Sequence, residues 1–290
     1  MGNLPKNVAA SVRARLLTLS KERNEPFDLL LTRYVLERLL YRLGSTDYRN
    51  RFVLKGATLV ATWVDNQFRP TRDLDLLGSG DPDPDALLAI FKEIAAVDAA
   101  DGVTFDPASF TVDRIRDENE YGGVRIKGNA TLENARVRVV IDIAFGDAIE
   151  PGVQETDLPA LLDFPAPKLR SYPRETVVAE KFQAMVALGL ANSRLKDFYD
   201  VWVLIRSYKC EGDALARAIK ATFARRKTDI PTALPDAFTE DAGKKDQWAA
   251  FTRQVAVDPG SLTEVAKTLA EFLMPRAKET RAVKHGAAET

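Results

Sequence analysis

The chain has almost none of the residues that bind soft metal ions or form disulfide bonds. Its 290 residues include one cysteine, Cys210, and one histidine, His285. A single cysteine excludes an internal disulfide framework and is typical of the reducing cytoplasm. A zinc site with the usual cysteine and histidine ligands is also excluded. Any bound metal should therefore be a hard cation held by carboxylates, such as Mg²⁺, Mn²⁺ or Ca²⁺.

Long hydrophobic runs are absent as well. No stretch of about 18 uncharged apolar residues could cross a membrane, and residues 1–6 lack the apolar run of a secretory signal. Hydrophobic residues make up 46% of the chain and charged residues 29%, a balance typical of soluble globular proteins. We expect a cytoplasmic protein without a membrane partner, large enough for one large domain or two modest ones.

The chain has no strong excess of either charge. The formal net charge is −1, which weighs against duplex DNA as an obligatory partner. Basic residues nevertheless gather in two regions, and charge clusters of this kind usually form a solvated surface. The first cluster comprises Arg114, Arg116, Arg125, Lys127, Arg136 and Arg138, and the second comprises Arg217, Lys220, Arg225, Arg226 and Lys227.

Hydrophobic periodicity divides the chain into a mixed part and a helical part. Helices are predicted over 8–17, 26–43, 58–64 and 86–96, and strands over 52–56, 72–77, 110–116, 123–130 and 136–144. A linker-like run with Pro159, Pro165, Pro167 and Pro173 follows. Helices are then predicted over 175–190, 195–207, 212–226 and 260–273, with a frayed tail after Pro275. We expect an α+β fold, with an α+β lobe over 1–165 and a helical lobe over 166–290.

The segment Arg72-Asp73-Leu74-Asp75-Leu76-Leu77 carries two carboxylates two residues apart. In a strand they point to the same face while the leucines turn into the core. Two negative charges this close repel each other unless a cation lies between them. Mg²⁺ would remove the conflict and leave coordination sites for phosphate oxygens. The alternative is that this short motif caps a turn or faces solvent.

A third carboxylate, Asp142, lies on the predicted strand 136–144. Alternation places it on the face opposite Val139 and Ile141. On a strand beside the Asp73–Asp75 strand it could serve as third metal ligand and general base. An ion pair with Arg138 along the same strand face is the alternative.

Two helices of the second half carry charges at positions where burial is expected. Lys181 lies at helical spacing from Val178 and Met185, so an anionic partner is expected near its ammonium. Asp197 and Asp200 share a face of a helix that is apolar nearly all round, with Asn192 or Ser193 as its N-cap. The alternative to a catalytic role is a buried salt-bridge cluster of Lys181, Arg194, Asp197 and Asp200.

Taken in order, these motifs resemble the AbiEii/AbiGii group of nucleotidyltransferase toxins, which includes the MenT toxins. The resemblance covers roughly residues 30–210. It rests on Lys55-Gly56-Ala57-Thr58, on Arg69-Pro-Thr71-Arg-Asp73-Leu-Asp75, on Glu180-Lys181 and on Arg194-Leu-Lys196-Asp197-Phe-Tyr-Asp200.

The resemblance implies a polymerase-β-like nucleotidyltransferase lobe beside a helical lobe, with the active site in the cleft between them. It implies transfer of a nucleoside monophosphate from an NTP with Mg²⁺ or Mn²⁺, to an RNA acceptor such as the 3′ end of tRNA, which blocks translation. A cognate antitoxin is the expected protein partner. Asp73 and Asp75 would be the metal ligands, Lys181 would contact the triphosphate, and Asp197 would be the essential carboxylate of the last motif. Thr71 occupies a position that is phosphorylated in some members.

The chain departs from the wider superfamily at one point. Gly56-Ala57 replaces Gly-Ser, so Thr58 or backbone amides at the start of the predicted helix would have to contact the phosphates. Lys55, Arg194 and Lys196 are further candidates for nucleotide binding. This departure supports the alternative of a nucleotide- or partner-binding protein of the same fold without turnover. A metal-dependent phosphohydrolase or nuclease that uses the same carboxylates is the other alternative.

Overall fold

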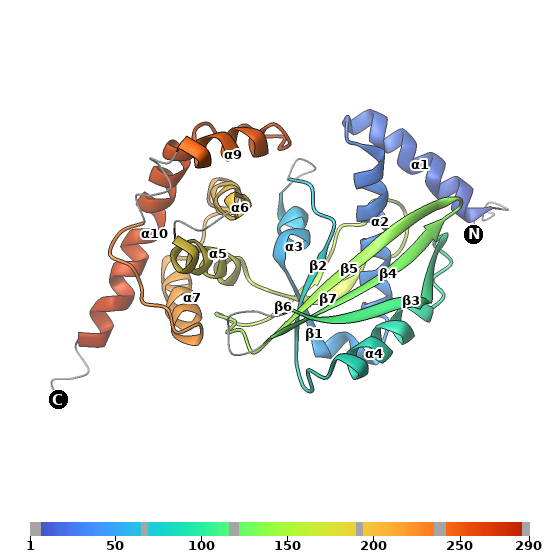
Figure 1. Ribbon diagram of the computed structural model, residues 1–290, viewed down its shortest axis with the longest axis horizontal. Coiled ribbons are helices and arrows are strands. Elements are labelled where there is room, and N and C mark those ends of the chain that lie inside the picture. The colour runs from blue at the N-terminus through green and yellow to red at the C-terminus, as the bar shows by residue number, and fades with distance from the viewer. Residues whose placement is uncertain (1–6, 65–68, 116–121, 190–193, 235–241, 286–290) are drawn as a thin grey trace. The chain divides into compact units, whose positions relative to one another are not determined.

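A computed structural model describes residues 7–64, 69–115, 122–189, 194–234 and 242–285. The chain divides into two compact units (Figure 1). The first consists of Met1–Thr62, Pro70–Gly146 and Glu155–Ser171, and the second of Trp63–Arg69, Asp147–Gln154 and Tyr172–Thr290. Instead of the single division predicted after residue 165, the chain passes between the units several times.

The first unit is built on a seven-stranded mixed sheet with the strand order β3-β4-β5-β2-β1-β7-β6. The strands are β1 (Phe52–Lys55), β2 (Leu74–Gly78), β3 (Val103–Ile115), β4 (Gly123–Leu132), β5 (Ala135–Phe145), β6 (Gln154–Asp157) and β7 (Lys168–Ser171). β3, β4 and β5 are antiparallel neighbours, while β2 pairs parallel with β5 and antiparallel with β1. The predicted mixed sheet with helices is therefore confirmed.

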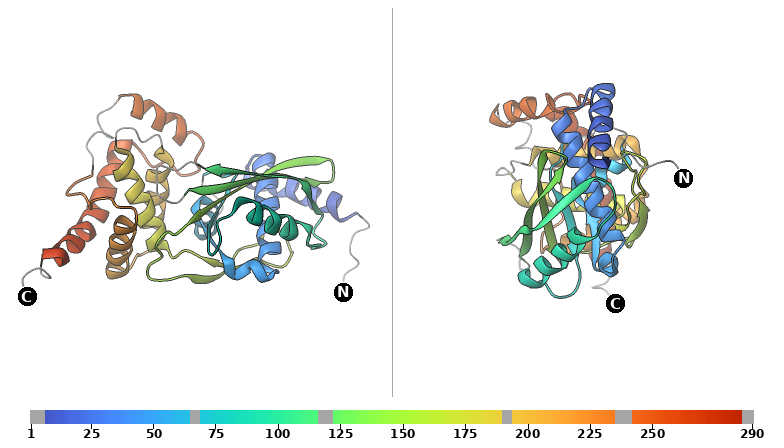
Figure 2. Two further views of the ribbon diagram at one scale, coloured as in Figure 1. Left: turned by 60° about the horizontal axis from the view of Figure 1, so that its bottom comes forward. Right: turned by 90° about the vertical axis from the view of Figure 1, so that its right-hand side faces the viewer.

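One face of the long strands is covered by helices. Alternation along β5 buries Val137 and Val139, at 5% and 0% exposure, while Arg138 between them is exposed. α2 (Phe27–Gly44) packs on β5 and β7, and α4 (Pro84–Ala96) packs on β3. Figures 1 and 2 show both helices on the same side of the long strands. α1 (Val8–Arg23) packs against α2 and β4, and a short 3₁₀ helix, η1 (Asp47–Arg51), precedes β1.

A buried ion pair fixes α2 to the loop before β3. Arg42 is 2% exposed and its guanidinium donates to both carboxylate oxygens of Asp101, at 2.6 and 3.1 Å. It also donates to the carbonyl oxygens of Val97 and Val103. Because these acceptors satisfy most of its donors, the guanidinium can lie inside the unit.

From Tyr172 onward the described residues form helices and contain no further strand. The helices are α5 (Arg174–Leu188), α6 (Leu195–Ser207), α7 (Gly212–Arg225), α9 (Ala242–Thr252) and α10 (Leu262–His285). α5 packs against α6 and α7, and α10 packs against the same two helices. The predicted helices over 175–190, 195–207 and 212–226 agree with α5, α6 and α7 to within a few residues, and α9 was not predicted.

Two sequence-based interpretations are wrong. The run with four prolines is not a linker, because it contains β7, which pairs parallel with β1, and because β6 lies directly before it. These strands are too short to show a clear alternation. Over residues 276–285, as far as the structure describes this end, the chain is not frayed, because α10 continues through Pro275 to His285. Ala277 and Thr280 are buried there, at 0% and 5% exposure, so tertiary packing outweighs the cost of proline in the helix.

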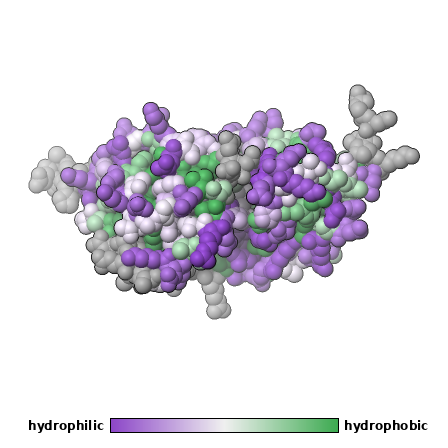
Figure 3. Space-filling model, turned by 90° about the horizontal axis from the view of Figure 1, so that it is seen from above, coloured by the Kyte–Doolittle hydropathy of each residue, from purple (hydrophilic) through white to green (hydrophobic). Residues whose placement is uncertain are grey.

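No described helix is long and apolar enough to span a membrane. The face of the molecule in Figure 3 is mostly hydrophilic and shows hydrophobic residues only in patches. Isolated apolar patches of this kind are normal on a protein surface.

Candidate active site

The two aspartates of the Asp-x-Asp motif lie at the start of β2. Asp73 directly precedes the strand and Asp75 is its second residue. Leu74 and Leu76 are buried at 0% and 1% exposure, while both aspartates are partly exposed. The leucines therefore anchor β2 in the core, as alternation predicts, and Asp75 lies on the opposite face.

Two threonines hold Asp73 in place. Thr71 Oγ1 donates to Asp73 Oδ1 over 2.8 Å. Thr58 Oγ1 donates to the backbone carbonyl of Asp73 over 2.9 Å. The Thr58 hydroxyl hydrogen is thus used within the protein, and Thr58 and Thr71 both act here as positioning residues for Asp73.

Asp75 lies directly over Gly56, the first residue of α3 (Gly56–Trp63). Gly56 has a φ of +70°, and a Cβ at this position would lie 1.9 Å from Asp75 Oδ2. Only glycine allows both this backbone conformation and this close approach. The N-terminus of α3, where backbone N–H groups lack helical acceptors, is therefore next to the Asp75 carboxylate.

Asp75 and Asp142 are neighbours in the sheet. β2 and β5 are parallel, and Asp75 is in register with Asp142, so their side chains share a face. On the other side of β2, Lys55 of β1 is in register with Asp75. The strand of Asp142 therefore lies beside the Asp-x-Asp strand, which is the arrangement that a third-carboxylate role of Asp142 requires.

Arg125 of β4 is the ion-pair partner of Asp142. Its Nε and Nη2 donate to Asp142 Oδ1 and Oδ2, both at 2.6 Å. The hydrogen bond to Asp142 raises the pKa of Arg125 although burial opposes it, and the charges of Asp73 and Asp75 contribute in the same direction. The negative charges of all three carboxylates thus stabilise the protonated guanidinium of Arg125. The expected alternative partner, Arg138, forms no ion pair with Asp142.

In the second unit, Lys181 joins α5 to α6. Its ammonium is 2.8 Å from Asp197 Oδ1 and 2.6 Å from Asp200 Oδ2, and both carboxylates are 0% exposed. Burial of Lys181 opposes its charge, but Asp197 and Asp200 outweigh burial and raise its pKa. Burial likewise opposes ionisation of Asp197, but Lys181 and Arg194 outweigh it and lower the pKa of Asp197. The sequence-based expectation of an anionic partner for Lys181 is confirmed.

Two arginines complete this buried cluster. Arg69 is 9% exposed and donates to both oxygens of Asp200, at 2.7 and 2.8 Å. Arg194 Nε lies 2.9 Å from Asp197 Oδ2, and about half of its side chain is exposed. Lys196, in the first turn of α6, is exposed. The proposed caps Asn192 and Ser193 lie outside the described residues, as does Arg116.

The second unit contains another charged cluster that the sequence analysis missed. Arg226 Nη2 lies 3.1 Å from Asp147 Oδ1 and 3.2 Å from Glu180 Oε1. Its Nη1 donates to Gln183 Oε1 over 3.0 Å. Burial opposes the charge of Arg226, but Glu180 and Asp147 raise its pKa. Arg226 therefore serves to connect α5 with the end of α7.

Among the described residues, no group of three or more acidic, histidine or cysteine side chains is arranged to hold a metal ion. Asp73 and Asp75 remain as a pair of carboxylates on one sheet. Oxygen ligands of this type suit Mg²⁺, which commonly binds through one or two carboxylates and keeps several waters. The donor set fits a magnesium ion shared with a substrate phosphate better than a closed structural site.

Residues 38–273 match the family described as nucleotidyl transferase AbiEii toxin of a type IV toxin–antitoxin system. The chain belongs to the AbiEii family. Membership supports nucleotidyl transfer and a place in a toxin–antitoxin system. It also implies an NTP substrate, typically with a divalent metal, and a cognate antitoxin.

Two solved structures from Helicobacter pylori share the fold of this AbiEii chain. JHP933 has 16% sequence identity and a TM-score of 0.52, with 90% of this chain and 96% of that chain covered. A candidate nucleotidyltransferase from the same organism has 16% identity and a TM-score of 0.51, with 88% and 96% covered. At this identity the likeness extends to the fold alone. Among curated proteins, none matches the chain.

Proposed function

We propose that this AbiEii protein transfers a nucleoside monophosphate from an NTP to an RNA acceptor, the 3′ end of tRNA, and thereby blocks translation. The observation that carries the proposal is the position of Asp75 over Gly56, beside Asp73 and in register with Asp142. A helix N-terminus beside carboxylates provides both N–H donors for phosphate and ligands for a cation.

Asp73 and Asp75 are the proposed magnesium ligands. When bound, the ion neutralises negative charge on the phosphate oxygens and orients them. Thr71 and Thr58 fix Asp73 for this role. Asp142 is proposed as third carboxylate and general base, a role that requires Arg125 to release at least one of its oxygens.

The remaining proposed contacts are to the triphosphate. The ammonium of Lys181 has three N–H donors, and Asp197 and Asp200 accept two of them. We propose that the third donates to a phosphate oxygen, with Arg194 and Lys196 as further cations. Because the Thr58 hydroxyl is engaged by Asp73, backbone amides of Gly56 and the following residues are the proposed phosphate donors of α3, with Lys55 beside them.

In the proposed reaction the RNA 3′ oxygen attacks the α-phosphorus of the NTP. The bond from the α-phosphorus to the bridging oxygen breaks, and pyrophosphate leaves. The proton of the 3′ hydroxyl passes to the Asp142 carboxylate. Asp197 holds Lys181 in position and keeps it charged.

The proposal is tested by incubating the purified protein with labelled NTPs, Mg²⁺ and total tRNA. We expect labelled, extended RNA and released pyrophosphate. Asp73→Ala should abolish labelling, by more than about 100-fold, because removing a group that stabilises transition-state charge costs a factor of this size. Asp163→Ala removes an exposed carboxylate of the first unit, 90% exposed, and should leave the rate unchanged.

Three results would contradict the proposal. Labelling that persists in Asp73→Ala would show that Asp73 is not part of the active site. Shortened RNA or free phosphate would indicate a nuclease or phosphohydrolase. Tight NTP binding without release of pyrophosphate would indicate a binding protein without turnover.

A further inference from the structure

The two basic clusters of the sequence have different surroundings in the structure. In the second cluster, Arg217 lies 3.8 Å from Glu150, and Arg226 contacts Asp147 and Glu180. Those arginines belong to the ion pairs of the second unit. In the first cluster, Arg125 and Lys127 have the acidic partners Asp142 and Asp113. Arg136 and Arg138 have no such partner among the described residues, and neither does Arg114, which lies on the other face of the sheet.

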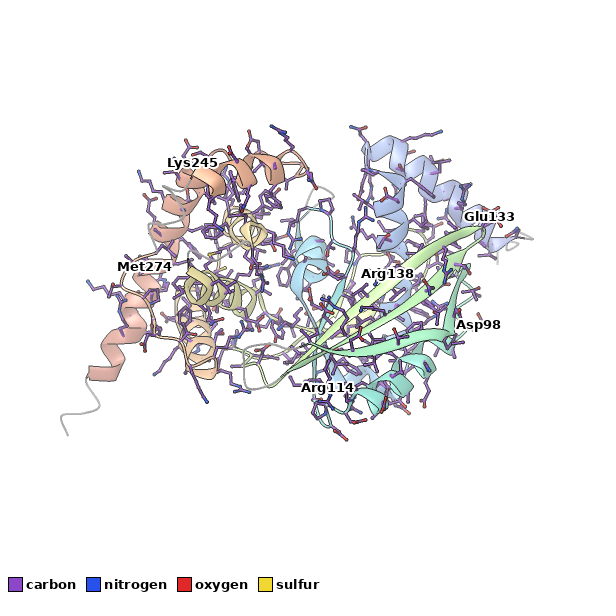
Figure 4. The ribbon with its side chains drawn as sticks, viewed as in Figure 1. Asp98, Arg114, Glu133, Arg138, Lys245 and Met274 are labelled. Carbon is purple, nitrogen blue, oxygen red and sulfur yellow. The ribbon has the colours of Figure 1, made fainter. Side chains whose placement is uncertain are left out.

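Arg136 and Arg138 are exposed on β5 and form no hydrogen bond or ion pair with any described residue. They alternate with Val137 and Val139, which are buried at 5% and 0% exposure. Both arginines therefore point away from the face that α2 covers, on the open face of the long strands (Figures 1 and 2). Figure 4 labels Arg138 on β5.

The same face carries further polar groups on β4. Asn129 is in register with Arg138, and Thr131 is in register with Arg136. Lys127 is in register with Val140, closer to Asp142 along the sheet. Lys127, Asn129, Arg136 and Arg138 form a continuous strip, which we call the β4–β5 strip.

The β4–β5 strip leads to the candidate active site. Asp142 is in register with Asp75, and Arg138 and Arg136 follow at four and six residues from Asp142 on the same face of β5. At about 3.3 Å per residue, the two arginines lie about 13 and 20 Å from Asp142 along the strand. These separations correspond to a few nucleotides of an extended chain, with successive strip residues about 7 Å apart.

We propose that the β4–β5 strip binds the phosphodiester backbone of a single-stranded segment of the RNA acceptor, so that its 3′ end reaches Asp73 and Asp75. Guanidinium groups match phosphate geometry with paired donors, and backbone contacts position a nucleic acid without reading its sequence. This inference rests on the proposed function. Since the net charge is only −1, the strip and not the whole-molecule field provides the attraction.

The test compares two double variants that each remove two positive charges from the first unit. Arg136→Ala/Arg138→Ala changes the strip. Lys92→Ala/Arg114→Ala is the matched control, because Lys92 belongs to α4 and Arg114 is in register with the buried Val124 on the other face. Thermal melting checks that both variants fold.

Binding of fluorescently labelled total tRNA is measured against salt concentration, and nucleotide transfer is measured against RNA concentration. For the strip variant we expect at least a tenfold weaker tRNA affinity and a higher KM for RNA, with unchanged kcat and NTP affinity. The slope of log affinity against log salt should fall by about 0.7 for each lost phosphate contact. The control variant should match the wild type.

Several outcomes overturn the inference. Equal losses of tRNA affinity in both variants would show that RNA binding depends only on overall charge. Unchanged tRNA affinity in the strip variant would exclude the β4–β5 strip as an RNA-binding surface. Loss of binding to an acidic antitoxin with unchanged tRNA binding would assign the strip to that protein. If the wild type binds tRNA through the strip but transfers no nucleotide, the proposed function fails while the RNA surface stands. If Asp73→Asn abolishes transfer and the strip variant binds tRNA and transfers nucleotide like the wild type, the proposed function stands and the RNA surface fails.

Discussion

At the scale of single residues, Asp73 and Asp75 are held by different means. Asp73 accepts a hydrogen bond from Thr71 at its carboxylate and one from Thr58 at its carbonyl oxygen. Asp75 lies over Gly56, in a space that any other side chain would fill. The position of one carboxylate therefore depends on hydroxyl groups, and that of the other depends on the absence of a side chain.

Gly56→Ala should displace Asp75. The new Cβ would lie 1.9 Å from Asp75 Oδ2, and the positive φ costs a further 1–2 kcal/mol or so. We expect loss of nucleotide transfer by more than about 100-fold, because a displacement of roughly 1 Å in a reacting group has an effect of this size. Transfer rates and the free energy of unfolding are measured on the same variant.

Gly189→Ala separates backbone strain from displacement. Gly189 also has a positive φ, of +47°, but no atom of the described residues lies within 4 Å of a Cβ there. We expect this variant to lose about 1–3 kcal/mol of stability, because a φ of +47° with a ψ of −130° is rarely adopted by residues other than glycine, and to keep its transfer activity. Equal activity in the two alanine variants would show that the contact of Gly56 with Asp75 does not matter.

At the scale of secondary-structure elements, the Lys181 cluster fixes α5 to α6. Lys181 comes from α5, Asp197 and Asp200 come from α6, and Arg69 comes from the segment before β2. The expected salt-bridge cluster is thus present, with Arg69 as an additional member. Its presence is compatible with the proposed phosphate contact, because buried charges can be structural and functional at the same site.

Asp197→Asn should destabilise the second unit. Removing one partner from a buried ion pair leaves charge uncompensated and costs about 3–5 kcal/mol. Asp213→Asn makes the same change in the first turn of α7, at an exposed position, and should cost no more than about 1 kcal/mol. Denaturant unfolding at pH 7 measures both variants, and equal losses would contradict a stabilising role of the cluster.

The difference between wild type and Asp197→Asn should depend on pH. Lys181 and Arg194 outweigh burial and hold the pKa of Asp197 below its ordinary value in the folded protein. The stabilisation is therefore fully present above the unfolded pKa of about 3.9 and is lost as the pH falls through the folded pKa. The free energies of unfolding of the wild type and of Asp197→Asn should converge below about pH 4 and should differ from pH 5 to 8.

At the scale of the whole molecule, no group of three or more acidic, histidine or cysteine side chains in the described chain is arranged as a closed metal site. A magnesium ion at Asp73 and Asp75 would thus serve the substrate and not the fold. Removing the metal should therefore abolish activity and leave the stability of the fold nearly unchanged.

EDTA should abolish nucleotide transfer and lower the Tm by less than about 2 °C. An ion present at its Kd stabilises a protein by only about 0.4 kcal/mol, and 1 kcal/mol shifts the Tm of a protein of this size by roughly 2–4 °C. Mg²⁺ and NTP added together should raise the Tm of the wild type but not that of Asp73→Ala. A large fall of the Tm in EDTA alone would indicate a structural metal.

The β4–β5 hairpin shows how much of the site the sequence could have provided. Its turn contains only Glu133 and Asn134, since Leu132 pairs with Ala135, and this register places Arg125 opposite Asp142. The predicted strands end at residue 130 and begin again at residue 136, and these bounds leave the loop length and the register open. Once the two-residue turn is known, counting residue pairs back from it identifies Arg125 as the cross-strand neighbour of Asp142.

The sequence alone determined which side chains alternate into the core, that two carboxylates meet at the start of one strand, and which family motifs the chain carries. These are local properties of the backbone period and of short segments. The tertiary structure decided which charges pair: Asp142 with Arg125, and Asp200 with Arg69, 131 residues away. It also decided that β6, β7 and the end of α10 form, because short or proline-containing segments become regular only when packing against distant residues stabilises them.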